Sequence, residues 1–184
     1  MKSVPYAPAV GTLMYAMVVT RPHISHVIGV VSIFMHNPGR SHWNAFKHVF
    51  KYLASTKDHD ILFDPNLTSG LVGYTDSDFV GCVDSRKSTT GYCYKFGNGA
   101  ISWKSRLQEC TTTSTTEAEY VAASDAAKEA LWLDRLTHTF RQVDSDSAPV
   151  FYSDSEGVVA LSKHPVHQDA SKHIDVRYHF FGTA

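Results

Sequence analysis

Three acidic residues in separate parts of the chain have the chemistry and the setting of a metal site. Asp76 stands close to the end of a segment rich in β-forming residues, and Asp154 follows a short apolar run. Glu119 lies near the start of a segment with helical character. Hard divalent cations such as Mg²⁺ prefer oxygen ligands and are usually held by a few carboxylates together with substrate phosphates. The three residues therefore point to phosphodiester chemistry.

The elements around these acids decide whether they meet. Residues 71–76 and 150–153 have the composition of strands, and Ser114 or Thr115 opens a long helix between them. If the first and fourth strands lie side by side, the three carboxylates converge at one end of the sheet. Carboxylates that close repel one another unless cations neutralise them, and a pair of metal ions about 3.5–4 Å apart does so. For any one of these acids alone, a role as a cap or turn residue stays open.

The remaining patterns in this region predict a mixed sheet. Residues 90–96 are rich in β-forming residues, and Gly97-Asn98-Gly99 is a strong hairpin signal into a further strand at 100–104. Helical patterns cover residues 158–161 and 171–181. The order strand–strand–strand–helix–strand–helix predicts an α+β domain in which helices pack on a mixed sheet.

The N-terminal third predicts a helical hairpin. Apolar residues between 24 and 35 recur with the period of one helical face. Asn37-Pro38-Gly39 ends this helix, and Ser41 is a candidate cap for the next one. Turn-forming residues at 64–70 mark a boundary. We therefore expect a helical segment over 1–66 and a second domain over 67–184.

Composition restricts the class of protein. With 43% hydrophobic and 12% aromatic residues, a chain of 184 residues can form a core. The formal net charge of −1 counts against a free-standing nucleic-acid binder. Cys82, Cys93 and Cys110 lack the spacing of a disulfide framework or a zinc site, which favours a reducing compartment. No apolar segment has the length of a membrane span, so we expect a soluble intracellular protein that is neither secreted nor membrane-bound.

Longer motifs run through almost the whole chain. They are Leu71-Val72-Gly73-Tyr74-Thr75-Asp76-Ser77-Asp78-Phe79, Asp84-Ser85-Arg86-Lys87-Ser88-Thr89-Thr90-Gly91-Tyr92, Ile101-Ser102-Trp103-Lys104-Ser105 and Lys172-His173-Ile174-Asp175-Val176-Arg177-Tyr178-His179-Phe180, with Thr20-Arg21-Pro22, Asn37-Pro38-Gly39 and Lys51-Tyr52-Leu53 before them. Together they resemble the C-terminal part of the Pol polyprotein of copia-type retrotransposons, where the end of a reverse transcriptase precedes a ribonuclease H domain. The chain has no polymerase motif of paired aspartates, so the resemblance does not imply DNA synthesis.

The resemblance implies a fold, an activity and a set of site residues. The fold would be a ribonuclease H-like mixed sheet with flanking helices, preceded by thumb- or connection-like helices. The activity would be hydrolysis of the RNA strand of RNA–DNA hybrids during reverse transcription, by two-metal catalysis with Mg²⁺ or Mn²⁺. Matched by position, Asp76, Glu119 and Asp154 would be catalytic and would bind the metal. Glu119 matches better than Glu117, which stays the alternative.

Four further residues are candidate substrate contacts. Thr115 and Thr116 precede the glutamate at the place where such enzymes contact the sugar edge of the hybrid, and the 2′-hydroxyl distinguishes RNA from DNA. A helix-capping role accounts for them equally well. Arg86 and Lys87 are candidates for contact with a phosphate backbone, and an ordinary charged turn is equally well supported.

The sequence leaves open whether the site is active. In the family a last strand and helix bring a fourth carboxylate. No residue of this chain matches that carboxylate. Asp175 is the nearest candidate, but it matches a helix that precedes the last strand. One expectation is a ribonuclease H that works with the rest of the Pol polyprotein, in a cytoplasmic virus-like particle or in the nucleus. The other is an inactive, truncated or domesticated remnant that at most binds nucleic acid or serves as a structural module. A zinc site at His164 and His167 is disfavoured by their spacing.

Overall fold

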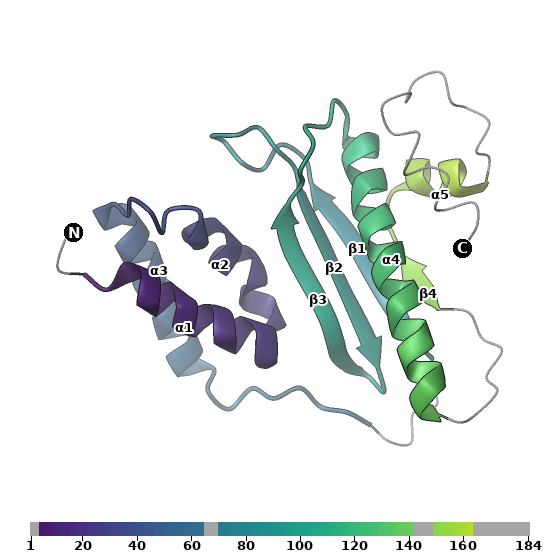
Figure 1. The fold of residues 1–184 in the computed structure, drawn as a ribbon, viewed down its shortest axis with the longest axis horizontal. Helices are drawn as coiled ribbons and strands as arrows, with labels where there is room; N and C mark the ends of the chain where they lie inside the picture. The colour runs from purple at the N-terminus through teal and green to yellow at the C-terminus, as the bar shows by residue number, and fades with distance from the viewer. Residues whose placement is uncertain (1–3, 65–69, 142–148, 164–184) are drawn as a thin grey trace. The chain divides into compact units, whose positions relative to one another are not determined.

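A computed structural model describes residues 4–64, 70–141 and 149–163 of the chain. The chain divides into two compact units, Met1–Leu62 and Phe63–Ala184 (Figure 1). The helix predicted at 171–181, together with His164, His167 and Asp175, lies outside the described residues. Among the described helices, none combines the length and the apolar character that crossing a membrane requires.

The N-terminal unit contains more helices than the sequence predicted. It comprises α1 (Tyr6–Val19), a 3₁₀ turn η1 (Pro22–Ile24), α2 (Ser25–Ser32) and α3 (Arg40–Ser55). The expected hairpin corresponds to α2 and α3. The additional helix α1 has apolar residues on all sides, so its sequence lacks the one-sided period by which amphipathic helices are recognised.

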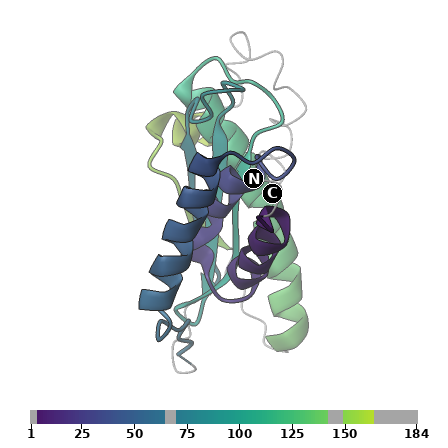
Figure 2. The same cartoon turned by 90° about the vertical axis from the view of Figure 1, so that its left-hand side faces the viewer.

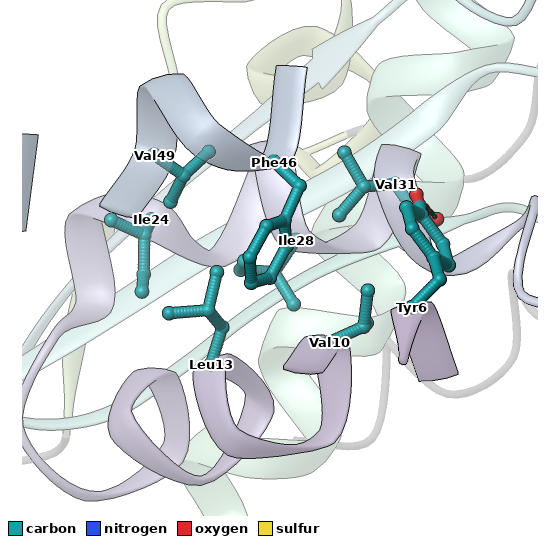
Figure 3. Packing of buried hydrophobic residues seen from close by; sticks show 8 residues of the cluster. All are labelled: Tyr6, Val10, Leu13, Ile24, Ile28, Val31, Phe46 and Val49. Carbon is teal, nitrogen blue, oxygen red and sulfur yellow. Dashed lines mark hydrogen bonds between the residues drawn. The ribbon is translucent and has the colours of Figure 1, made fainter. Parts of the chain in front are cut away.

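The three helices of this unit share one apolar core, shown in Figure 3. Its buried members are Tyr6, Val10, Leu13, Ile24, Ile28, Val31, Phe46 and Val49. The Tyr6 hydroxyl donates a hydrogen bond to the Val31 carbonyl at 2.8 Å, which satisfies its polar group inside the core. Stability of this unit therefore comes from packing between helices, as is usual for short helices.

The predicted cap of α3 was wrong. The helix begins at Arg40, with Gly39 in an extended conformation at the N-cap, so Ser41 lies inside the first turn. The amide of Gly39 donates to Nδ1 of His42 at 2.9 Å. A side chain from the third helical position thus satisfies this amide, in the manner of a capping box, and no hydroxyl is needed at the helix start.

The C-terminal unit is built on a four-stranded mixed sheet. Its strands are β1 (Val72–Asp78), β2 (Thr89–Phe96), β3 (Gly99–Leu107) and β4 (Val150–Tyr152), in the order β3-β2-β1-β4. The β1–β2 and β2–β3 pairs are antiparallel, and β1–β4 is parallel. This arrangement, flanked by helices, confirms the predicted ribonuclease H-like α+β fold class, and the first and fourth strands are neighbours as expected.

The turn between β2 and β3 follows from its sequence. Gly97 and Asn98 both have positive φ, at 55° and 65°. Two consecutive residues of this kind characterise the tight turn whose twist matches that of the flanking strands. The hairpin predicted from Gly97-Asn98-Gly99 is therefore confirmed.

Helix α4 (Thr115–Arg141) covers one face of this sheet (Figures 1 and 2). Its packing side is a stripe of buried alanines, Ala118, Ala122, Ala126 and Ala130. The ring of Tyr94 in β2 is fully buried, and its hydroxyl donates to the Ala126 carbonyl at 2.8 Å. The ring fills the space above Gly73 of β1, where a Cβ atom would overlap it. Small residues on α4 and β1 thus allow the helix to approach the sheet closely.

Candidate metal centre

The parallel pair of β1 and β4 sets the positions of two of the three predicted acids. Tyr74 of β1 is paired with Tyr152 of β4. Asp76 and Asp154 each follow two residues later, so they arrive at the same level on neighbouring chains. Each of Asp76, Glu119 and Asp154 offers a carboxylate oxygen, and these oxygens lie within 4.8 Å of one another. The structure therefore brings together the three residues that the sequence singled out.

The start of α4 determines which glutamate joins this cluster. Glu117 turns back over the helix start, where its Oε2 accepts hydrogen bonds from the amide and the hydroxyl of Thr113 at 2.6 and 2.8 Å. The Ser114 hydroxyl accepts from the Glu117 amide at 3.2 Å and caps the helix. Glu117 therefore takes part in capping, and Glu119 is the glutamate that faces the two aspartates.

The carboxylate of Glu119 is held on one side and open on the other. Its Oε1 accepts two hydrogen bonds from Ser77 of β1, from the amide at 3.2 Å and from the hydroxyl at 3.0 Å. Its Oε2 is buried and has no hydrogen-bond partner among the residues that the structure describes. A buried acceptor without a donor costs roughly 1–3 kcal/mol. A cation at the cluster would satisfy this oxygen.

The electrostatics of the cluster favour a bound cation. The pKa of Glu119 is raised above its usual value, mainly because burial disfavours the charged form. The hydrogen bonds from Ser77 lower it, and the negative charges of Asp76 and Asp154 raise it further. A divalent cation would counteract both causes of the increase, because it stabilises the ionised carboxylate and offsets the repulsion between the acids.

Thr115 and Thr116 lie in the first turn of α4, where both residues are exposed. Neither is the N-cap. The capping hydrogen bonds are made by Ser114, whose hydroxyl accepts from the Glu117 amide, and by Thr113, whose amide donates to the Glu117 carboxylate. The Cγ2 atom of Thr116 lies close to Gly157 in α5 (Glu156–Lys163), where an added Cβ would approach it to 2.8 Å. Their proposed contact with the sugar edge of a hybrid stays a prediction.

Arg86 and Lys87 lie in the loop between β1 and β2. The Lys87 ammonium donates to the Glu109 carbonyl at 2.8 Å and so connects this loop to the chain after β3. Arg86 is exposed and has a positive φ of 55°. Lys87 thus has a structural contact, and the contact of either residue with a phosphate stays a prediction.

Ser77 is a residue of the centre that the sequence analysis did not single out. A signal was present, because side chains alternate between the two faces of a strand. Ser77 and Asp76 therefore point to opposite faces of the sheet, and the side chain of Ser77 is on the face that α4 covers. The sequence did not reveal the contact of Ser77 with Glu119, because it does not give the distance between the end of β1 and the first turns of α4.

Comparisons with known proteins relate this chain to transposon Pol polyproteins. The retrovirus-related Pol polyprotein from transposon TNT 1-94 of Nicotiana tabacum is 49% identical over 183 residues, which are 98% of this chain and 13% of that protein. The retrovirus-related Pol polyprotein from transposon RE2 of Arabidopsis thaliana is 38% identical over 95% of this chain and 12% of that protein. This chain is homologous to transposon Pol polyproteins. It spans about one eighth of the length of these two relatives.

A shorter protein is also similar to much of this chain. The secreted RxLR effector protein 161 of Plasmopara viticola is 48% identical over 133 residues, which are 72% of this chain and 94% of that protein. No protein-family model matches the chain, and no solved structure matches it. Homology therefore supports a retrotransposon Pol fragment, and the chemistry of the site has to be argued from its residues.

Proposed function

We propose that this chain provides a ribonuclease H-type site, which hydrolyses the RNA strand of RNA–DNA hybrids with Mg²⁺ or Mn²⁺ as part of a Pol polyprotein. The observation that carries the proposal is the meeting of Asp76, Glu119 and Asp154, whose ligand oxygens lie within 4.8 Å of one another. The buried, unpartnered Oε2 of Glu119 supports it, because a protein gains nothing from such an atom unless a cation or a donor occupies the site.

The spacing of the acids fits magnesium. Mg²⁺ holds six oxygens at about 2.0–2.1 Å in an octahedron, so two ligand oxygens of one ion are about 3.0 Å apart when adjacent and about 4.2 Å apart when opposite. The observed limit of 4.8 Å is slightly wider, and small side-chain rotations close the difference. When bound, such ions polarise the phosphate and activate a water for in-line displacement. Ser77 fixes Oε1 of Glu119, which leaves Oε2 for the metal.

The charge distribution supports a nucleic-acid partner. Residues 1–57 contain six Lys or Arg residues and no Asp or Glu, although the whole chain has a formal net charge of −1. Helix α3 is seen from the side in Figure 2. Its exposed basic residues are Arg40, Lys47 and Lys51. They fall within about 40° of one another around the helix axis. Such a basic stripe is the usual footprint of contact with a phosphate backbone.

A cleavage assay tests the proposal. The chain, by itself and joined to neighbouring Pol sequence, is incubated with a labelled RNA–DNA hybrid, the single-stranded RNA and duplex DNA, in Mg²⁺, Mn²⁺ or EDTA. We expect metal-dependent cleavage of RNA in the hybrid alone, lost in Asp76→Asn and kept in Glu109→Gln, which neutralises an exposed carboxylate paired with Arg106. Cleavage that survives Asp76→Asn or EDTA, or no cleavage by either form, contradicts the proposal.

Nucleic-acid binding without catalysis is the second candidate function. The basic stripe on α3 favours it, because that stripe does not depend on the carboxylate cluster. In this case the chain would bind the hybrid in a salt-sensitive manner, Asp76→Asn would bind equally well, and no metal would produce cleavage.

A further inference from the structure

A buried glutamine lies behind the carboxylate cluster. Gln108 directly follows β3, and it is only 4% exposed. Its Nε2 donates to the Ala118 carbonyl at 2.9 Å and to the Thr90 hydroxyl of β2 at 3.2 Å. The Ala118 carbonyl belongs to the peptide group that leads into Glu119. Gln108 thus connects the sheet to the backbone immediately before the metal-binding glutamate.

The neighbours of this glutamine form a buried polar layer. The Gln108 amide donates to the Ser88 carbonyl at 2.9 Å. The Ser88 hydroxyl accepts from the Val80 amide at 3.1 Å and is hydrogen-bonded to the Thr112 hydroxyl at 2.9 Å. Ser88 is fully buried, and Thr112 is 4% exposed. The layer therefore joins the loop after β1, the ends of β2 and β3, and the approach to α4.

The orientation of the glutamine amide follows from its partners. A flipped amide would set Oε1 against the Ala118 carbonyl oxygen, and two acceptors repel. In the observed orientation Oε1 is buried without a hydrogen-bond partner in the described part of the chain. An apolar side chain of similar size would avoid this cost. The reason for an amide at this position is therefore the pair of hydrogen bonds that Nε2 donates to Thr90 and Ala118.

We propose that Gln108 is a positioning residue, which fixes the peptide group before Glu119 and thereby sets the distance of its carboxylate from Asp76 and Asp154. The proposal rests on the metal centre proposed above. Metal ligands must be held within about 0.5 Å of their productive positions. Asp76 lies in β1, Asp154 follows the end of β4 by two residues and Glu119 lies in α4, so any shift of α4 along the sheet changes the spacing of the cluster.

Ser77 of β1 holds the carboxylate of Glu119, and the remaining ties between the helix and the sheet lie farther along α4. The Tyr94 hydroxyl bonds the Ala126 carbonyl at 2.8 Å, and the Ser102 hydroxyl bonds Oε1 of Glu129 at 2.6 Å. Ala126 and Glu129 lie eight and eleven residues beyond Ala118, which corresponds to about 12 and 16 Å along the helix. Gln108 thus ties the backbone of α4 to the sheet at the end where the acids meet.

The test compares Gln108→Met with Ser102→Ala. The first change keeps the side-chain size and removes the donor, and the second removes a tie between the same two elements far from the cluster. Mg²⁺ affinity of the folded protein is measured by titration calorimetry, and amide hydrogen exchange is measured in the metal-free protein. We expect Gln108→Met to bind Mg²⁺ at least about five-fold more weakly, and to exchange faster at 117–120 than at 126–133. Ser102→Ala should keep the wild-type affinity.

Each outcome decides whether Gln108 positions Glu119 or has only a structural role. Equal affinities and equal exchange at 117–120 in both variants would show that Gln108 is merely structural. If the wild-type chain binds no Mg²⁺, the metal centre fails as a proposal, and the exchange at 117–120 still decides whether Gln108 holds this turn. If Gln108→Met does not fold, Thr90→Val removes one partner of Nε2 and should change both readouts in the same direction by a smaller factor. No change in that variant would also overturn the proposal.

Discussion

Replacing Asp76 by Asn should stabilise the metal-free protein and abolish its stabilisation by magnesium. In the absence of a cation, three carboxylates within 4.8 Å of one another repel. Asparagine keeps the shape of the side chain and removes two of the three repulsions. It also removes a ligand charge, so the two effects have opposite signs in the presence and absence of metal.

The magnitude follows from the spacing. Two unit charges 4.8 Å apart repel by about 0.9 kcal/mol in a water-like dielectric, which suits an exposed residue such as Asp76. Removing two such repulsions gives about 1.7 kcal/mol at low ionic strength, and about 1 kcal/mol in 0.1 M salt, where the screening length is about 10 Å. For a chain of this size a gain of about 1–1.7 kcal/mol raises Tm by about 2–7 °C. Magnesium at a hundred times its Kd stabilises the wild type by about 2.7 kcal/mol.

Thermal unfolding at pH 8 in EDTA and in Mg²⁺ measures both effects. We expect Asp76→Asn to melt above the wild type in EDTA and below it in saturating Mg²⁺. Glu109→Gln is the matched control, because this exposed carboxylate pairs only with Arg106 at 3.2 Å among the described ion pairs, and such surface pairs contribute at most about 1 kcal/mol. Its response to Mg²⁺ should equal that of the wild type. A lower Tm of Asp76→Asn than of the wild type in EDTA would show that the three carboxylates do not repel one another, and an equal Mg²⁺ response in these two proteins would show that they do not share a cation.

Three other perturbations give separate expectations. Because the pKa of Glu119 is raised in the folded state, the metal-free protein should lose stability as the pH rises from the usual pKa of a carboxyl group to the raised pKa. Thermal melts in EDTA between pH 4 and 7 should therefore show a Tm that depends less on pH in Glu119→Gln than in the wild type. An equal dependence of Tm on pH in both proteins would contradict this expectation. Gly73→Ala places a Cβ inside a buried ring and should cost about 3 kcal/mol in urea unfolding. Gly11→Ala is the matched control, because its Cβ would meet no described atom within 4 Å apart from its chain neighbours and the backbone of its own helix, and it should gain about 0.5–1 kcal/mol. Lys51→Gln should reduce the slope of log K against log salt concentration for hybrid binding by about 0.9. Lys128→Gln, in the other unit, should leave this slope unchanged. Equal slopes in the wild type and both variants would exclude α3 from the contact with the hybrid.

Local patterns were sufficient to predict most elements of the C-terminal unit. The hairpin at Gly97 and Asn98 was predictable because its backbone conformation is accessible to few residue types. The strand that contains Asp76 and the strand that precedes Asp154 were predictable from β-forming residues next to turn signals. The N-terminal unit was less predictable, since α1 has no polar face and α3 is capped through His42 rather than through a hydroxyl.

The order of residues along the chain was enough to identify the three acids and the elements that carry them. Which of the acidic residues meet depends on how the helix packs against the sheet. Glu117 and Glu119 are two residues apart, so they point about 160° apart around the helix. The buried alanine stripe on α4 sets the rotation of that helix against the sheet and turns Glu119 toward Asp76. The hydrogen bonds from Ser77 and Gln108 join residues 42 and 10 positions apart in the chain, and contacts of this kind depend on how strands and helices pack rather than on any local pattern.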